Sequence, residues 1–339
     1  MTGVQTCALP IYDLFYIGAG LGTGTDFSEE RFFNGEMAEV IVYHYELNDA
    51  QRIIVENYLA SKYHPVFTIA ADHYRFDENY GHAVAGIGRL NPANFHTTAQ
   101  SGGVIRFSNA SGLDDNEFLF FGHDDGSMSS WSSTGAPDDS VRILPRRWRL
   151  DETGEPGTCV VQLDTALLPP KPAGYVAYSL WLDGDGDFTS GAVRVPLEWN
   201  GDVYEATGLD LTDGQYLAVS VIKPIIGFTL ESSGGDESDL SVSLEAGLNY
   251  PVSFDAAVDY SVRVSSTATG AGDDYTLPPG TLTIPSGDLT AAIELQITDD
   301  TDPETDETVE VLLENPGNGV SLGPDTLHVY TIQDNDNAR

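Results

Sequence analysis

Apolar and polar residues alternate along the last third of the chain in the pattern of half-buried β-strands. In the run Ala291–Ile297 every second residue is apolar, and Glu294 and Gln296 fill the alternate positions. Successive side chains of a strand point to opposite faces, so one face of this strand is expected inside and the other in water. Further strands are predicted at Asp259–Val264, Thr281–Ile284, Val309–Leu313 and His328–Ile332. Short strands at this spacing predict a β-sandwich over residues 225–337.

The middle of the chain, residues 66–222, shows the same kind of pattern. Turn signals such as Gly154-Glu155-Pro156-Gly157 separate its apolar runs. The predicted strands are Gly103–Phe107, Glu117–Phe121, Val141–Leu144, Thr158–Leu163, Tyr175–Leu182, Val193–Leu197 and Gln215–Val221. These runs predict a second β-sandwich, and the fold class of the chain is therefore all-β, with sandwich modules in tandem.

One short helix interrupts the β pattern. Met37–Tyr43 is rich in β-branched and aromatic residues and predicts a strand, and the segment after it predicts a helix. Asn48 is a good N-cap, and Gln51 stands three residues later, as a capping box requires. Ala50, Ile54 and Tyr58 then form an apolar stripe, with Ile53 and Leu59 beside it, so the helix is expected to pack on a sheet.

Charge and composition limit the classes of partner that the chain is expected to bind. The chain has 339 residues and a formal net charge of −38, with 53 acidic and 15 basic residues. No basic stripe is present to displace phosphate counterions, so neither nucleic acid nor an anionic membrane surface is an expected partner. No apolar run is long enough to cross a membrane. The acidity suits either solubility outside the cell or a cluster of carboxylates around divalent cations.

The acidic residues are concentrated near the end of the chain. Residues 225–339 carry 22 Asp and Glu, against two Arg and no Lys. Six acids, from Asp299 to Glu307, fall within nine residues. Two carboxylates about 4 Å apart repel by roughly 4 kcal/mol at an effective dielectric near 20. Calcium relieves such crowding because it accepts six to eight oxygens in loose geometry. The alternative is a solvated acidic hairpin loop.

The order of motifs in this region resembles the Calx-beta domain, a module of sodium–calcium exchangers and bacterial surface adhesins. The motifs are Gly272-Asp273-Asp274-Tyr275, then Gly280–Gly287, the acidic loop 299–307, and Ile332–Asp336. The resemblance implies an immunoglobulin-like sandwich that binds Ca²⁺ at one end. Motif by motif it implies the ligands Glu237, Asp274, Asp299, Asp300, Glu304, Glu307, Asp334 and Asp336. Asn335 interrupts the final aspartates, so one or two ions are expected, bound at roughly 10⁻⁵ to 10⁻³ M.

A second acidic loop stands in the middle of the chain. Asp183, Asp185 and Asp187 alternate with glycines, as in the first half of an EF-hand loop. The twelfth position of such a loop would be Arg194, so the second half of the motif is missing. The segment is therefore either a weak calcium site or a plain β-turn.

Resemblances at the start of the chain concern its architecture. Residues 1–12, MTGVQTCALPIY, resemble a translated sequencing-adapter read-through and are expected to be non-native. Residues 13–65 resemble, through Gly35–His64, the end of a LamG-like, concanavalin-type jelly roll. Residues 66–222 resemble an uncharacterised domain that follows LamG-like modules in bacterial surface proteins. The native protein is expected to begin further upstream.

Arg146, Arg147 and Arg149 flank Trp148 in the middle unit. Two interpretations are open: an exposed basic-aromatic patch for sugar or phosphate, or a buried tryptophan whose arginines pair with the abundant acids. No G-x-S-x-G elbow or zinc-binding spacing accompanies the histidines, so no enzyme is predicted.

Taken together, these patterns predict a non-catalytic, calcium-binding modular protein, extracellular or on the cell surface, with a structural or adhesive role. Its partners would be calcium ions and, in adhesion, glycans or other surface proteins. The alternative is a carbohydrate-binding adhesin or the accessory region of a secreted glycan-active enzyme.

Overall fold

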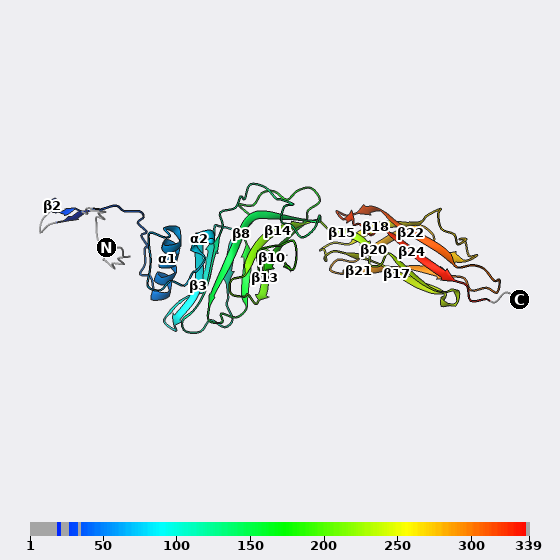
Figure 1. Cartoon of the computed structure of the whole chain (residues 1–339), viewed down its shortest axis with the longest axis horizontal. Coiled ribbons are helices and arrows are strands. Elements are labelled where there is room, and N and C mark those ends of the chain that lie inside the picture. Colours follow the sequence, from blue (N-terminus) through cyan, green and yellow to red (C-terminus); the bar gives the residue numbers. More distant parts are fainter. Residues whose placement is uncertain (1–18, 22–26, 33–34, 337–339) are drawn as a thin grey trace.

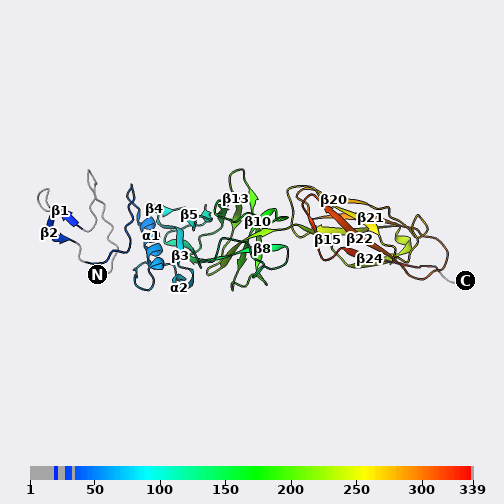
Figure 2. The ribbon, with the colours of Figure 1, turned by 90° about the horizontal axis from the view of Figure 1, so that it is seen from above.

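The computed structural model describes residues 19–21, 27–32 and 35–336, and the folded units follow one another along the long axis of the molecule (Figure 1, Figure 2). Strands are its dominant regular structure, as the sequence predicts. Strands β1 (Ala19–Leu21) and β2 (Phe27–Phe32) form an antiparallel pair. Residues 1–12, predicted to be non-native, lie outside the described residues, as does part of the predicted jelly-roll end.

The strand predicted at Met37–Tyr43 is wrong. These residues are extended but pair with no other described segment, and Val42 is 58% exposed. A strand needs a neighbour to satisfy its backbone groups, so β-branched composition alone does not produce one.

The predicted helix is confirmed as α1 (Asp49–Lys62), with the capping box between Asn48 and Gln51 formed in both directions. Its buried face differs from the predicted stripe and contains Ala50, Ile53, Asn57, Ala60 and Ser61. Helix α1 packs on the middle sandwich through a small core that includes Phe118 and Phe120. A short second helix, α2 (Asp77–Tyr80), follows it.

The middle unit is a sandwich of two sheets. The larger sheet has the order β11-β10-β14-β8-β7-β3-β4, and the smaller has β12-β13-β9-β6-β5. The strands are β3 (His82–Asn91), β4 (Asn94–His96), β5 (Thr98–Ser101), β6 (Ile105–Ser108), β7 (Glu117–His123), β8 (Val141–Thr153), β9 (Cys159–Leu163), β10 (Ala177–Asp183), β11 (Val193–Pro196), β12 (Glu198–Trp199), β13 (Tyr204–Leu209) and β14 (Tyr216–Ile222).

The faces of the two sheets enclose one core, with Trp148, Leu217 and Val219 on the larger sheet and Phe107 and Val161 on the smaller. The other face of the larger sheet carries α1 over β3 and β7. Alternating side chains of β7 therefore enter two different cores, which explains its unbroken burial from Phe118 to His123.

The terminal unit is a second sandwich. One sheet has the order β19-β21-β17-β15-β23 and the other β16-β24-β22-β18-β20. The strands are β15 (Ile225–Phe228), β16 (Ser232–Asp236), β17 (Ser241–Leu248), β18 (Ala256–Val262), β19 (Tyr275–Thr276), β20 (Gly280–Ile284), β21 (Thr290–Ile297), β22 (Glu307–Gly317), β23 (Ser321–Leu322) and β24 (Leu327–Gln333), with the 3-10 helix η1 (Glu237–Asp239) after β16. The predicted alternation is confirmed in β21, where Ile293, Leu295 and Ile297 are buried while Glu294 and Gln296 are exposed.

The middle and terminal sandwiches meet without a free linker. Strand β14 ends at Ile222 and β15 begins at Ile225. The side chain of Asn249 donates to Ser140 Oγ over 3.0 Å and accepts from the backbone N–H of Ile225 over 3.1 Å. Tyr250 donates its hydroxyl to the carbonyl of Ile222 over 3.3 Å. One continuous cluster of buried apolar residues spans the two units, so they pack as one rod. Among the described helices, none is both long and apolar enough to cross a membrane.

Candidate metal centre

The topology of the terminal sandwich brings separate acidic stretches to one end. Strands β16 and β24 are parallel neighbours, so Glu237 and Asp334 both follow strand ends on the same side. Strand β22 runs antiparallel to β24 and therefore begins at that end, with Glu307 as its first residue. Strand β21 finishes there and leads into the loop that carries Glu304, while Asp274 immediately precedes β19, the partner of β21. This end of the molecule is the one away from the middle unit (Figure 1).

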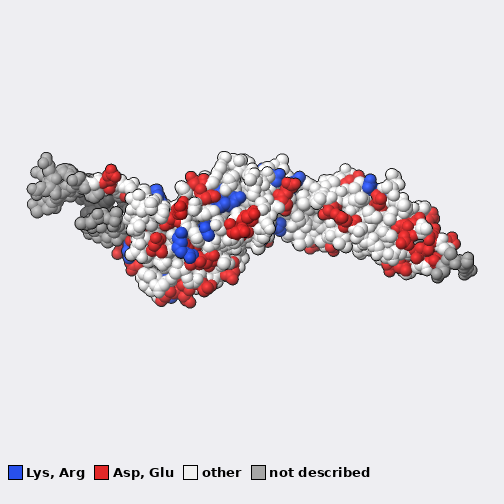
Figure 3. Space-filling view, in the orientation of Figure 1, with Lys and Arg blue, Asp and Glu red and all other residues white. Residues whose placement is uncertain are grey.

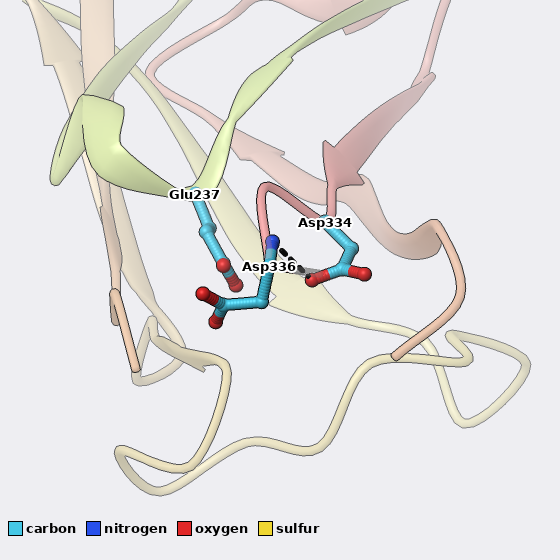
Figure 4. Close-up of side chains that lie close together, drawn as sticks. All are labelled: Glu237, Asp334 and Asp336. Atoms are coloured by element: carbon cyan, nitrogen blue, oxygen red, sulfur yellow. Dashed lines mark hydrogen bonds between the residues drawn. The ribbon is translucent and has the colours of Figure 1, made fainter. Parts of the chain in front are cut away.

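One group of carboxylates is formed by Glu237, Asp334 and Asp336, which approach one another in Figure 4. Each offers an oxygen, and the three oxygens lie within 4.8 Å of one another. Glu237 is only 6% exposed, and burial together with Asp336 and Asp334 raises the pKa of its carboxyl. The backbone N–H of Asp336 donates to Asp334 Oδ1 over 3.0 Å, which fixes the tight turn between them.

A second group is formed by Asp274, Glu304 and Glu307, again with one oxygen from each within 4.8 Å of the others. Burial, together with the contact to Asp274, raises the pKa of Glu307 to about 7. The charge of Asp274 is the largest cause of the raised pKa of Glu304. A small cavity lies between the two groups. It is lined by Glu237 and Asp334 of the first group, by all three residues of the second group, and by Asp300.

Two carboxylate oxygens of these groups have no protein partner. Glu307 Oε2 and Asp336 Oδ2 are closed off from solvent and accept no hydrogen bond within the described chain. Burying an unpaired carboxylate oxygen is costly, so a ligand that such oxygens could bind must be electropositive. The protein offers none nearby, because Arg263 is the sole Lys or Arg between residues 225 and 336, and it pairs with Glu310 over 3.2 Å. Red surface dominates this end in Figure 3.

Six of the eight sequence-predicted ligands belong to these two groups. Of the other two, Asp300 lines the cavity between the groups. Asp299 lies at its edge and accepts a hydrogen bond of 3.3 Å from the side-chain amide of Asn335. That amide also donates to Asp236 over 2.9 Å, a residue that sequence reasoning missed. Asp236 additionally accepts from Ser238 through backbone and hydroxyl, contacts that lower the pKa of its carboxyl. An acid followed two residues later by Ser is a turn signal that could have indicated its place.

The second predicted site, in the loop after β10, has a different geometry. Asp183 is 6% exposed and accepts hydrogen bonds from the backbone N–H groups of Asp185 over 2.8 Å and Gly186 over 2.5 Å. Asp185 accepts from the backbone of Asp187, and Asp187 from Thr189. The three side chains cap successive turns, and they are absent from the close carboxylate groups found among the described residues. Calcium binding by this loop stays a prediction.

The chemistry of the two main groups suits a hard cation. All their ligand atoms are carboxylate oxygens, which Ca²⁺ accepts at about 2.3–2.6 Å in flexible geometry. Zn²⁺ would favour His or Cys. His328, the one histidine between residues 225 and 336, is buried and bonded instead to Ser233 and to the carbonyl of Leu230.

Comparisons with solved structures return Calx domains. The chain is similar to the apo form of the Calx CBD1 domain, with 26% identity and a TM-score of 0.31 over 33% of this chain and 98% of that one. The calcium binding domain CBD12 of CALX1.1 matches with 26% identity and a TM-score of 0.31, over 33% of this chain and 44% of that one. The Calx CBD2 domain matches at 18% identity and a TM-score of 0.30, over 33% and 86%. These TM-scores are below 0.5, so the case for a cation site rests on the side chains described above.

No curated protein matches the chain. A family match instead covers residues 43–215, which include α1 and nearly all of the middle sandwich but not the acidic end. Helix α1 shares a core with β3 and β7, in agreement with a family unit that begins before the helix. Because this match spans half of the sequence, the chain belongs to the family described as Domain of unknown function (DUF8202).

Proposed function

We propose that residues 225–336 form a calcium-binding module, and that the chain is a non-catalytic modular protein of the cell exterior or cell surface. The observation that carries the first part is the pair of buried, unpartnered oxygens of Glu307 and Asp336, one in each carboxylate group. A cation in each group supplies the missing partner and cancels the repulsion between carboxylates. The order of the sequence motifs adds the resemblance to the Calx-beta domain.

Calcium at this end has a mechanical consequence. The stretches that carry the ligands are loops and strand ends, which open more readily than the sandwich core. An ion in the first group ties η1 to the segment after β24, and an ion in the second group ties the loop before β19 to the loop between β21 and β22. The joint with the middle unit lies at the opposite end and is packed through Asn249 and Tyr250 without any carboxylate cluster. The ions therefore stiffen the end of the terminal sandwich that lies away from the middle unit, and we place the contact with an adhesive or structural partner there.

The experiment is a calcium titration of the full chain, read by calorimetry and by thermal unfolding. Binding of Ca²⁺ to the native state alone stabilises it by about 2.7 kcal/mol at a hundred times Kd. The double variant Glu237→Gln with Glu307→Gln should lose most of the heat and of the rise in Tm. The matched control, Glu231→Gln with Asp288→Asn, removes two exposed acids outside the groups and should keep both.

A comparison with Mg²⁺ distinguishes a specific calcium site from nonspecific screening by divalent cations. Mg²⁺ demands octahedral geometry and keeps its waters, so it should stabilise the chain far less than Ca²⁺ at equal concentration. Equal effects of the two ions, or equal loss in test and control variants, would contradict the proposal. A calcium-insensitive wild-type Tm would do the same.

A further inference from the structure

Two arginines on the outer face of the middle sandwich form no ion pair, although the chain is rich in acidic residues. The chain has 53 acidic and 15 basic residues. Arg75 pairs with Asp151 and Asp213, and Arg146 pairs with Asp125. Within the described chain, Arg147 and Arg149 of β8 pair with no carboxylate, although Trp148 between them is fully buried. Trp148 is therefore buried and Arg146 pairs with an acid, as the second interpretation predicts, whereas Arg147 and Arg149 do not pair with one.

The guanidinium of Arg149 lies close to two aromatic rings. Its Cζ lies 3.7 Å from the ring centroid of Phe76 and 4.4 Å from that of Tyr216, which is its directly opposed partner on β14. Nε donates to the carbonyl of Gly214 over 3.3 Å, and the two Nη atoms have no acceptor among the described residues. The two rings pack against the guanidinium, and its Nη donors are left for a ligand.

Arg147 stands two residues before Arg149 on the same strand and thus on the same face. Its Cζ lies 5.0 Å from the ring centroid of Phe188, and its Nη1 donates to the carbonyls of Leu144 and Arg146, while Nη2 has no acceptor in the described chain. Tyr80 lies edge-on to Tyr216, with 5.6 Å between ring centroids, and within the field of both guanidinium groups. The site thus offers an open fork, a second positive charge and a phenol.

We propose that Arg149, with Arg147 and Tyr80 beside it, binds the carboxylate of a uronic acid residue in an acidic glycan. A guanidinium fork matches a planar carboxylate with two parallel hydrogen bonds. Polyanions of high charge density are disfavoured, because Asp124 and the loop Asp183–Asp187 border the patch. A uronate carries one charge on a ring of neutral hydroxyls, which the phenol of Tyr80 can also bond. Blue and red lie interspersed over this unit in Figure 3, unlike the uniformly acidic far end.

The inference concerns the family unit and is independent of the calcium module. It is tested on the full chain with three probes: a glucose oligosaccharide that carries a single glucuronic acid residue, a neutral glucose oligosaccharide of the same length, and a glutamate oligopeptide. The acidic sugar should bind, more weakly as salt rises, and the other two should not. Arg149→Gln should weaken binding at least about tenfold, the effect of losing a charge-assisted pair of hydrogen bonds. Arg149→Lys, which keeps the charge but not the fork, should also weaken it.

The matched control is Arg106→Gln, which removes an exposed arginine bonded only to Gln100 on the other sheet and should leave binding unchanged. Should the Arg149 variants unfold, two further measurements decide. The guanidinium NMR signals of wild-type Arg149 should shift on addition of the acidic sugar, and Tyr80→Phe should weaken binding without loss of fold. Absence of binding, equal binding of the neutral sugar, preference for the peptide, or equal loss in the Arg106 variant would each overturn the proposal.

Discussion

The side-chain amide of Asn335 donates a hydrogen bond of 2.9 Å to Oδ1 of Asp236, across a separation of 99 residues in sequence. The same amide reaches Asp299 over 3.3 Å. An amide nitrogen thereby stands between two carboxylates where a further acid would have added a third charge. Because the amide adds no negative charge, it does not create a third ion site, and at most one ion is expected in each of the two carboxylate groups beside it.

Replacing this amide by a carboxylate should make the stability of the protein depend more strongly on calcium. Asn335→Asp removes the two donated hydrogen bonds and places a third carboxylate between Asp236 and Asp299. The calcium-free Tm should fall, by an amount corresponding to about 1–3 kcal/mol, and the rise in Tm with Ca²⁺ should exceed that of the wild type. The control is Asn318→Asp, because Asn318 donates instead to the carbonyl of Asp255, outside both groups. A calcium response unchanged from wild type would count against the role of Asn335.

Neutralising one buried acid should have the opposite effect on the calcium-free protein. Glu307→Gln keeps the shape of the side chain but removes a charge that burial and Asp274 disfavour. Without calcium the variant should be more stable than wild type, by on the order of 1 kcal/mol, and it should gain less from added Ca²⁺. Glu310→Gln, three residues on, breaks the pair with Arg263 and should be neutral or slightly destabilising. Denaturant unfolding with and without chelator measures both; a destabilised calcium-free Glu307→Gln variant contradicts the expectation.

A buried histidine should make the middle sandwich sensitive to mild acid. Burial and the charge of Arg146 lower the pKa of His123 to about 4. Its Nδ1 accepts from the backbone of Asp125 over 3.0 Å, so protonation would break a contact. An unfolded histidine titrates near ~6.5, so the unfolded state binds more protons between these values. The contribution is present in full above about pH 6.5 and is lost as pH falls toward 4, by roughly 3 kcal/mol.

His123→Gln should flatten this part of the stability curve, measured by denaturant unfolding at a series of pH values. Exposed His44 supplies the control, since His44→Gln should leave the pH dependence as in wild type. An equal loss of stability from pH 6.5 to pH 4 in the wild type and in both variants would show that His123 does not control this window.

One buried amide ties α1 to the segment that leads from it toward the middle sandwich. Asn57 is fully buried, donates to the carbonyls of Ile53 and Ala71, and accepts from the backbone N–H groups of His73 and Tyr74. Asn57→Ala leaves these backbone groups without partners and opens a cavity, so it should cost about 2–4 kcal/mol. Thermal unfolding measures the loss, with exposed Asn79→Ala as a near-neutral control. A cost below that of the control would mean that α1 does not fold cooperatively with the sandwich.

Much of the β structure could be read from alternation, but strand β3 could not. Its residues include Gly86 and Gly88, which favour a turn on propensity alone. A Cβ on Gly88 would lie 2.0 Å from the ring of Phe118, and one on Gly86 2.8 Å from that of Phe120. The glycines leave room for two rings of β7 to lie over β3 beneath α1. The requirement comes from a neighbour about 30 residues away, so local pattern reasoning misses it.

The acidic end shows a similar division. Motif order alone indicated which acids are ligand candidates, and the structure brings six of the eight into two groups, with Asp300 in the cavity between them. Local sequence could mark Asp236 only as a turn residue, because its contact with Asn335 exists only when β16 and β24 lie side by side.

By itself, the sequence determined the all-β class, the capped helix and the concentration of acid near one end, because these depend on local periodicity, capping and composition. Only the tertiary structure decided which acids share an ion position, which arginines keep their donors free, and which face of α1 is buried. Those outcomes depend on distances between side chains from strands far apart in sequence, and such distances are fixed by sheet order and register rather than by any local pattern.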